Sequence, residues 1–149
     1  LWHDMSKYTP VEFWNGAKYY QGTQSPNVAE RKDRGYSKAW LHHKGVNRHH
    51  FEYWTDLNRE TNRYESVPMP RRYLAEMIMD RRAACMVYEG EKYTDRSPLA
   101  YYERSLDRNL MHPKLKQELH FLLEMLAEKG ESETVRLKIY NFIKNNRLG

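Results

Sequence analysis

The sequence predicts an all-α fold, and three observations support this. Apolar residues recur at helical spacing in several segments. Prolines and capping residues precede these segments, and glycines follow them, which is the order found at helix starts and ends. The alternation of apolar and polar residues that is typical of strands is not evident.

The first third of the chain predicts three helices. Thr9, Pro10 and Glu12 match a capping box with proline at the first helical position, so a helix is expected from Pro10 to near Gly22. A second helix is expected from Asn27 or Val28 to His42 or His43. Gly35 can interrupt it, and Gly45 marks its end. Residues 47–54 predict a short helix.

The rest of the chain predicts a polar mobile loop over residues 55–67, followed by four helices. Pro70 starts the first of them, and Asp80 shares its apolar stripe because it lies three residues after Met77. Ser97 and Pro98 start the next. The first two helices have their apolar positions at Leu74, Met77, Ile78 and Cys85, and at Tyr101, Tyr102 and Leu106. The third has Leu115, Leu119, Leu122 and Leu126 and ends before Gly130. The last has Val135, Ile139, Phe142 and Ile143.

Composition favours one folded domain over residues 1–149. The chain is polar, with a mean hydropathy of −1.00, but its 12 Tyr, 4 Trp and 4 Phe can supply a core. A net charge of +5 favours anionic partners such as phosphate-containing small molecules or nucleic acid. A single cysteine, Cys85, and no long apolar run or signal peptide predict a cytoplasmic protein without a membrane segment.

Histidines and acidic residues gather in two short segments and predict a metal site. His3 and Asp4 are adjacent, and a cluster follows with His42, His43, His49 and His50. Imidazole nitrogen and carboxylate oxygen are common ligands of divalent metals such as Mn, Fe, Zn, Co and Ni. Helical bundles build such sites from inward side chains on several helices, which also makes Asp80 a candidate ligand.

These residues, in this order, resemble the HD (His-Asp) metal-dependent phosphohydrolase superfamily. The resemblance implies a bundle of six to seven helices and a divalent metal, Mg included, held by His3, Asp4, members of the histidine cluster and Asp80. It also implies that Lys7, in His-Asp-x-x-Lys, faces substrate phosphate. The family's first histidine lies before the doublet, so we expect an upstream helix outside this sequence. Glu52 is a further candidate, to orient a ligand or accept a proton.

A second resemblance covers most of the chain. A family of bacterial and phage proteins with no established activity carries the motif His-Asp-x-Ser-Lys-Tyr-x-Pro-x-Glu-Phe-Trp, matched from His3 to Trp14. The same family carries His-His...Asn-x-His-His-x-Glu-Tyr-Trp, matched from His42 to Trp54, and a helix similar to residues 69–84.

Four other features have structural interpretations. His112 is expected as a turn or cap residue, and His120 as a surface or packing residue. The aromatic residues Phe13, Trp14, Tyr19 and Tyr20 are expected in the core. A His-Asn-His nuclease is disfavoured, because that fold needs a hairpin between its ligands and residues 40–54 show no strand pattern.

Three functions remain open from the sequence. The leading hypothesis is a metal-dependent phosphohydrolase that acts on a nucleotide or another phosphate ester. The second is an HD-like di-iron oxygenase, because a pocket rich in histidine and carboxylate also suits iron. The third is a non-catalytic, metal-stabilised module that binds nucleic acid or protein.

Overall fold

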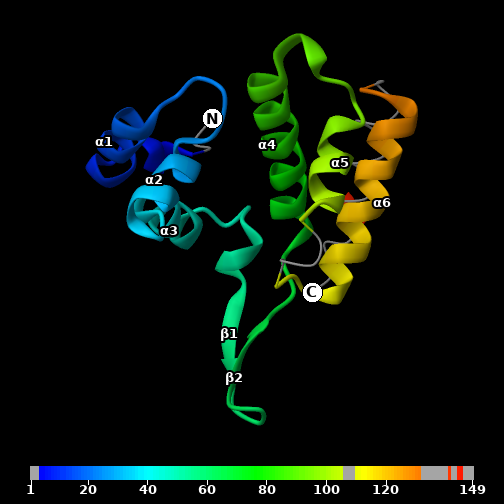
Figure 1. Ribbon diagram of the computed structural model, residues 1–149. Helices are drawn as coiled ribbons and strands as arrows, with labels where there is room; N and C mark the ends of the chain where they lie inside the picture. Colours follow the sequence, from blue (N-terminus) through cyan, green and yellow to red (C-terminus); the bar gives the residue numbers. More distant parts are fainter. Residues whose placement is uncertain (1–3, 106–109, 132–140, 142–143, 146–149) are drawn as a thin grey trace. The chain divides into compact units, whose positions relative to one another are not determined.

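The computed structural model describes residues 4–105, 110–131, 141 and 144–145 (Figure 1). This part of the chain is mostly helical and contains one small antiparallel sheet, so the helical class is confirmed but the fold is not purely all-α. The chain divides into two compact units, Leu1–Tyr53 and Trp54–Gly149. The single domain stays a prediction, since two compact units can belong to one domain.

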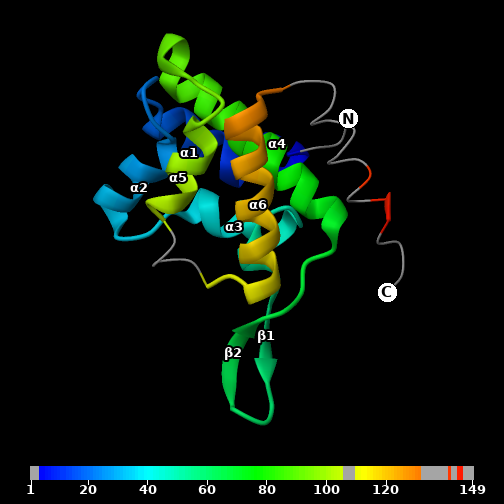
Figure 2. The same ribbon diagram turned by 90° about the vertical axis from the view of Figure 1, so that its right-hand side faces the viewer.

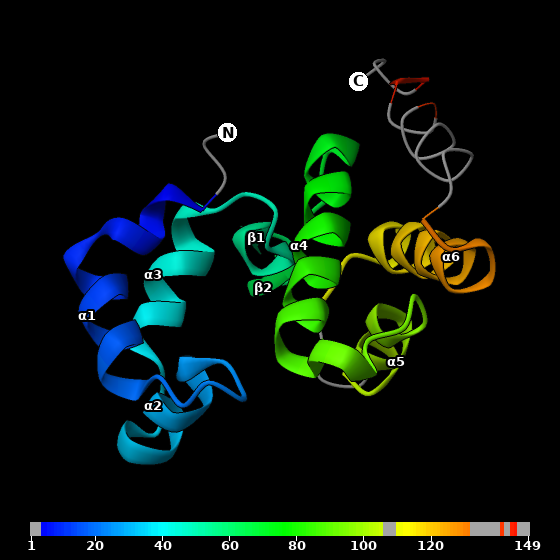
Figure 3. The same cartoon turned by 90° about the horizontal axis from the view of Figure 1, so that it is seen from above.

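The first unit consists of three α-helices and two short 3₁₀ helices. Helix α1 packs against both α2 and α3, and η1 contacts α1 and α3 (Figure 3). The elements are η1 (Met5–Tyr8), α1 (Pro10–Tyr19), α2 (Pro26–Arg34), α3 (Lys38–Val46) and η2 (Phe51–Tyr53).

The predicted second helix is broken into α2 and α3. Gly35 ends α2 with φ of 80°, a left-handed conformation that glycine adopts without steric cost. Ser37 then caps α3, because its Oγ accepts a hydrogen bond from the Trp40 amide at 3.0 Å. The buried Glu30 accepts from Ser37 Oγ at 2.7 Å and so ties α2 to this cap. Gly45 does not end α3, which continues to Val46.

The second unit is built on three α-helices that follow a hairpin. Helix α5 packs against α4 and α6. The fully buried residues of this unit include Leu74 on α4, Tyr102 on α5 and Leu119 on α6. Arg71 on α4 and Glu118 on α6 form an ion pair at 2.7 Å. The elements are β1 (Thr55–Asn58), β2 (Arg63–Ser66), α4 (Arg71–Glu89), η3 (Gly90–Lys92), α5 (Ser97–Glu103) and α6 (Pro113–Lys129).

The predicted apolar stripes of α4 and α6 are buried. Burial also raises the pKa of the Cys85 thiol, which fits a structural role. His112 caps α6 as predicted, since its ring nitrogen accepts from the Lys114 amide. His120 is partly exposed and packs beside the Tyr102 ring. Leu106 and the apolar positions of the predicted last helix lie outside the described residues.

The mobile loop predicted over residues 55–67 is wrong, because these residues form a β-hairpin (Figure 2). Asn58 organises the turn, since its Oδ1 accepts from the Glu60 amide at 2.9 Å. Leu57 and Tyr64 are cross-strand partners, yet both are exposed. The hairpin therefore lacks a buried face, and its sequence lacks the alternation that would have predicted strands.

The aromatic residues of α1 also differ from expectation. Only Tyr19 is buried, whereas Phe13, Trp14 and Tyr20 are 52%, 68% and 70% exposed. The buried side of α1 is used instead by the carboxylate of Glu12. Among the described residues, no helix has the length and apolar character that crossing a membrane requires.

We predict that Leu119→Ala lowers the free energy of unfolding by about 2–5 kcal/mol, because it opens a cavity at a position with 0% exposure. Urea denaturation measures this change. The matched control on the same helix is Phe121→Ala, which removes a larger but 55% exposed side chain and should cost within about 0.5 kcal/mol. Equal losses in the two variants would contradict the assignment of this core.

We predict that the Glu65 carboxyl titrates below the usual glutamate pKa, because Thr61 and Asn58 donate hydrogen bonds to its ionised form. Its contribution to hairpin stability is present above the unfolded pKa and is lost as pH falls through the lower folded pKa. NMR titration should show that Thr61→Val raises the Glu65 pKa. Thr55→Val in the same hairpin should not, and a matching rise there would refute this cause.

Candidate metal centre

Four side chains of the first unit bring metal-ligating atoms together. One ligand atom from each of Asp4, His43, His49 and His50 lies within 4.8 Å of all the others. His43 lies on α3, while His49 and His50 follow in the segment between α3 and η2. Asp4 immediately precedes η1, so the fold of this unit brings together positions about forty residues apart.

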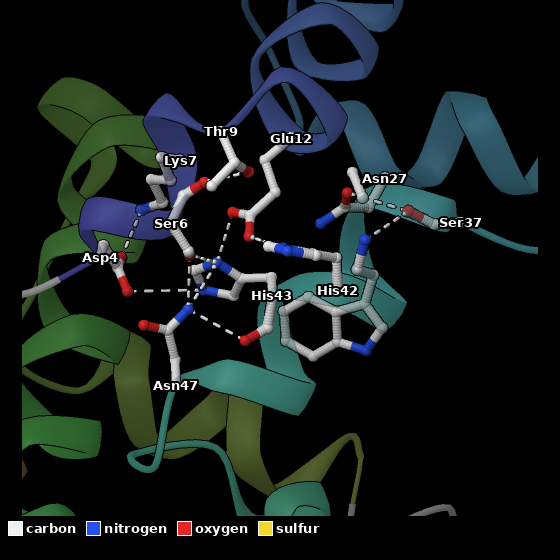
Figure 4. Close-up of polar contacts among 12 residues, drawn as sticks. Asp4, Ser6, Lys7, Thr9, Glu12, Asn27, Ser37, His42, His43 and Asn47 are labelled. Carbon is white, nitrogen blue, oxygen red and sulfur yellow. Dashed lines mark hydrogen bonds and ion pairs between the residues drawn. The ribbon is translucent and has the colours of Figure 1, made fainter.

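Asp4 contacts the lysine and two of the histidines around it. Its Oδ1 lies 3.4 Å from His49 Nε2 and 3.5 Å from His43 Nε2. Its Oδ2 forms an ion pair with Lys7 Nζ at 2.6 Å (Figure 4). The Asp4 backbone is left-handed, with φ of 57° and ψ of 24°. Non-glycine residues in this region carry local strain and concentrate at functional sites.

The cluster is shielded from solvent. Asp4 is 7% exposed and His49 is 2% exposed, and the Nε2 atom of His50 is also buried. The imidazoles pack ring against ring, with centroids 4.2 Å apart for His49 and His50 and 4.7 Å apart for His43 and His50. The ring of Trp40 packs edge-to-face against the His50 ring, with the two centroids 4.8 Å apart. This environment strengthens electrostatic interactions within the cluster.

The two histidines of α3 meet the carboxylate of Glu12 from α1 (Figure 4). His42 Nδ1 lies 2.6 Å from Oε1, and His43 Nδ1 lies 2.8 Å from Oε2. His43 therefore presents opposite ring nitrogens to two carboxylates, Nδ1 to Glu12 and Nε2 to Asp4. His42 is one-third exposed and lies outside the metal-ligating group.

Ser6 and Asn47 complete the surroundings of the His43 ring. Asn47 Nδ2 donates to Ser6 Oγ at 2.7 Å and to the His43 carbonyl oxygen at 2.9 Å. Ser6 Oγ lies 3.2 Å from His43 Nδ1. These contacts link η1, α3 and the residue that caps the end of α3, so they fix the segment that carries the metal-ligating residues.

The capping box expected at the start of α1 is absent. Helix α1 does begin at Pro10, but Thr9 makes no side-chain cap and its Oγ1 donates to the Ser6 carbonyl oxygen at 2.6 Å. Glu12 points to the histidines rather than back to the Thr9 amide. The burial of this carboxylate is possible because two imidazoles hydrogen-bond it.

The donor set fits a divalent transition metal. Three imidazoles and one carboxylate are a common ligand set for zinc and its neighbours. Metal–nitrogen bonds of about 2.0–2.1 Å in a tetrahedral site place neighbouring ligand atoms about 3.4 Å apart. The two Asp4–histidine separations, 3.4 and 3.5 Å, match that value.

The structure brings together four of the seven predicted ligands. Asp4, His43, His49 and His50 form the cluster, and Lys7 contacts it through Asp4. His42 contacts Glu12 instead. Glu52 lies on η2 with its Oε2 shielded from solvent. Asp80 is half-buried on α4, in the second unit, and His3 lies outside the described residues.

Sequence reasoning missed Glu12, Ser6 and Asn47 as part of the site. All three belong to the two motifs quoted above, the first ending at Trp14 and the second at Trp54. They were overlooked because Glu12 also fits a helix cap, and because a serine and an asparagine carry no metal signature. Residues 40–54 contain the end of α3 and η2 and no hairpin.

Comparison with known proteins places the chain in a family but not in a functional class. No curated protein and no solved structure matches the chain. One family model, described as a family of unknown function (DUF5662), matches residues 1–125 and so includes every residue of the cluster. The chain therefore belongs to the DUF5662 family.

Proposed function

We propose that the protein is a metal-dependent phosphohydrolase that acts on a nucleotide or another phosphate ester. One observation carries the proposal: a buried set of three imidazoles and one carboxylate adjoins a lysine that reaches the protein surface. The HD-like helical bundle implied by the sequence resemblance belongs to the same proposal.

In this proposal Asp4, His43, His49 and His50 hold a divalent ion. Such an ion lowers the pKa of bound water and polarises a phosphoryl oxygen. The chain's contribution is a compact ligand group with restricted access of bulk water. Trp40 and the packed imidazole rings provide that restriction.

Lys7 is the candidate for binding substrate phosphate. Its ammonium group contacts the Asp4 oxygen that does not face His43 and His49, and its side chain is 60% exposed. A cation that touches a ligand carboxylate and also reaches solvent can neutralise a phosphate group that arrives there. Lysine binds phosphate as a mobile point charge, which suits this exposed position.

The charge distribution of the first unit favours an anionic substrate. Asp4, Glu12 and Glu30 are buried, so their charges lie inside the unit. Asp33 is the only acidic residue in the exposed class among the described positions 4–53. The exposed basic residues in the same range are Lys7, Lys18, Arg31, Lys32, Arg34, Lys38 and Arg48. An excess of surface cations raises the local concentration of anions.

Three further residues extend the proposal beyond the cluster. The sequence resemblance implies His3 and Asp80 as further ligands, and Glu52 is the candidate that orients a ligand or accepts a proton. Glu52 is supported by its position two residues after His50. Asp80 is supported by its position three residues after the buried Met77 on α4, and His3 by its adjacency to Asp4.

A structural metal site is the second candidate function. Four buried ligands in a unit of about fifty residues are enough to fill a closed tetrahedral site. Small units with few buried apolar residues often depend on such a metal for folding. In that case the metal raises thermal stability, and no phosphate ester is hydrolysed.

We predict that purified protein contains a stoichiometric divalent metal and that Asp4→Asn or His49→Ala removes most of it. Asp4→Asn removes the negative charge of the carboxylate ligand, and His49→Ala removes the imidazole that faces it. Elemental mass spectrometry measures the content, and circular dichroism verifies folding. His120→Ala, a partly exposed histidine of α6, is the matched control and should retain full metal content.

Metal-free wild-type protein, even after incubation with Mn, Fe, Zn, Co or Ni, would refute the metal centre. Equal metal content in Asp4→Asn would refute its assignment to this cluster. Iron as the bound element would direct the activity screen to oxygen-dependent reactions.

We predict that Lys7→Ala lowers kcat/KM for the best phosphate ester by about 10- to 1,000-fold, on the scale of a lost charge-stabilising donor. The metal content should stay unchanged. Lys32→Ala, which removes an exposed lysine from α2, is the control and should retain activity. Screening nucleotides and simple phosphomonoesters with metal-loaded protein tests the proposal, and no turnover with any of them would favour the structural metal site.

A further inference from the structure

We propose that Glu12 is a positioning residue that fixes the His43 ring, so that Nε2 is the nitrogen that binds the metal. The inference rests on the proposed metal centre and deepens it. It also explains why the His42–His43 doublet contributes one member to the cluster and not two.

The hydrogen-bond chemistry determines which nitrogen of His43 carries hydrogen. An ionised carboxylate only accepts hydrogen bonds, so His43 must donate from Nδ1 across the 2.8 Å contact to Glu12 Oε2. In the neutral imidazole, which is the form that binds metal, Nε2 then carries the lone pair. That atom faces Asp4 Oδ1 at 3.5 Å, on the side where the ligand atoms converge.

Asn47 offers a competing interaction that its other contacts exclude. Its Nδ2 lies 3.0 Å from His43 Nδ1, so it would be the donor if His43 carried hydrogen on Nε2. However, the two amide hydrogens are directed at Ser6 Oγ and the His43 carbonyl oxygen, at 2.7 and 2.9 Å. Glu12 therefore decides the tautomer.

One carboxylate controls two neighbouring side chains of α3. Successive residues of a helix point about 100° apart, so His42 and His43 cannot both face the cluster. Glu12 contacts His42 through Oε1 at 2.6 Å and His43 through Oε2 (Figure 4). The packing of α1 against α3 thus orients the ligand, with the buried His43 inside and the one-third exposed His42 outside.

A ring held in this way binds metal more tightly, because its tautomer and orientation are set in advance. Loss of such an outer hydrogen bond typically weakens metal binding by about 10- to 100-fold. In Glu12→Gln, the side chain keeps one acceptor oxygen for two donating imidazoles. Its NH2 group therefore faces the N–H group of one imidazole, and that hydrogen bond is lost. We expect a loss of zinc affinity within that range.

The test combines zinc affinity with the tautomer of His43. Competition with a chelator measures the Zn²⁺ dissociation constant of wild type, Glu12→Gln and Glu30→Gln. Glu30→Gln removes a buried charge from the same unit but contacts the α3 cap and not the cluster, so its affinity should match wild type. Long-range ¹H–¹⁵N NMR of the imidazoles should show hydrogen on His43 Nδ1 without zinc and Nε2 as the zinc-bound nitrogen.

Wild-type zinc affinity in Glu12→Gln, or an equal loss in Glu30→Gln, would overturn the proposal. So would a His43 ring that carries hydrogen on Nε2 and not on Nδ1 in the zinc-free wild type. The NMR measurement needs no bound metal, so it distinguishes failure of the Glu12 assignment from failure of the metal centre.

Discussion

Burial of carboxylates is the constraint on which the first unit depends. Asp4, Glu12 and Glu30 are each at most 7% exposed, in a unit whose described buried apolar residues are only Tyr19 and Ala39. Buried charge is costly unless partners compensate it. Glu30 is compensated by the start of α3, Glu12 by two imidazoles, and Asp4 by Lys7 and the histidine cluster. Polar contacts with specific geometry therefore hold this unit in one arrangement.

The same contacts connect fold and chemistry. Glu12 joins α1 to α3 and, in the same interaction, aims His43 at Asp4. Trp40 packs on the imidazole rings and belongs to the helix that carries His43. The family assignment supplies no activity, so function has to be argued from the site itself. The site offers a nitrogen-rich group of side chains that could hold a metal, the exposed ammonium group of Lys7 beside it, and a basic exterior.

Periodicity and residue type predicted the parts of the structure that depend on local sequence. The α4 and α6 stripes and the clustered histidines all have a direct sequence signature. Glu12 did not, because its position three residues after Thr9 fits a helix cap as well as a long-range contact. The hairpin was missed because neither of its faces is buried. The aromatic residues of α1 were assigned to the core because hydrophobicity alone does not say which side of a helix is covered. The contribution of Asp80 stays a prediction, since periodicity places it on α4 but not relative to the histidines.

The most direct test of the account is X-ray absorption spectroscopy at the zinc edge of the zinc-loaded protein. The account predicts a first shell of three imidazole nitrogens and one carboxylate oxygen at about 2.0–2.1 Å. The outer shells should show the scattering of three imidazole rings. In His49→Ala, the fraction of zinc that remains bound should show the scattering of two imidazoles instead of three. A shell of oxygen atoms without imidazole scattering, or a spectrum unchanged in His49→Ala, would contradict a metal centre at Asp4, His43, His49 and His50.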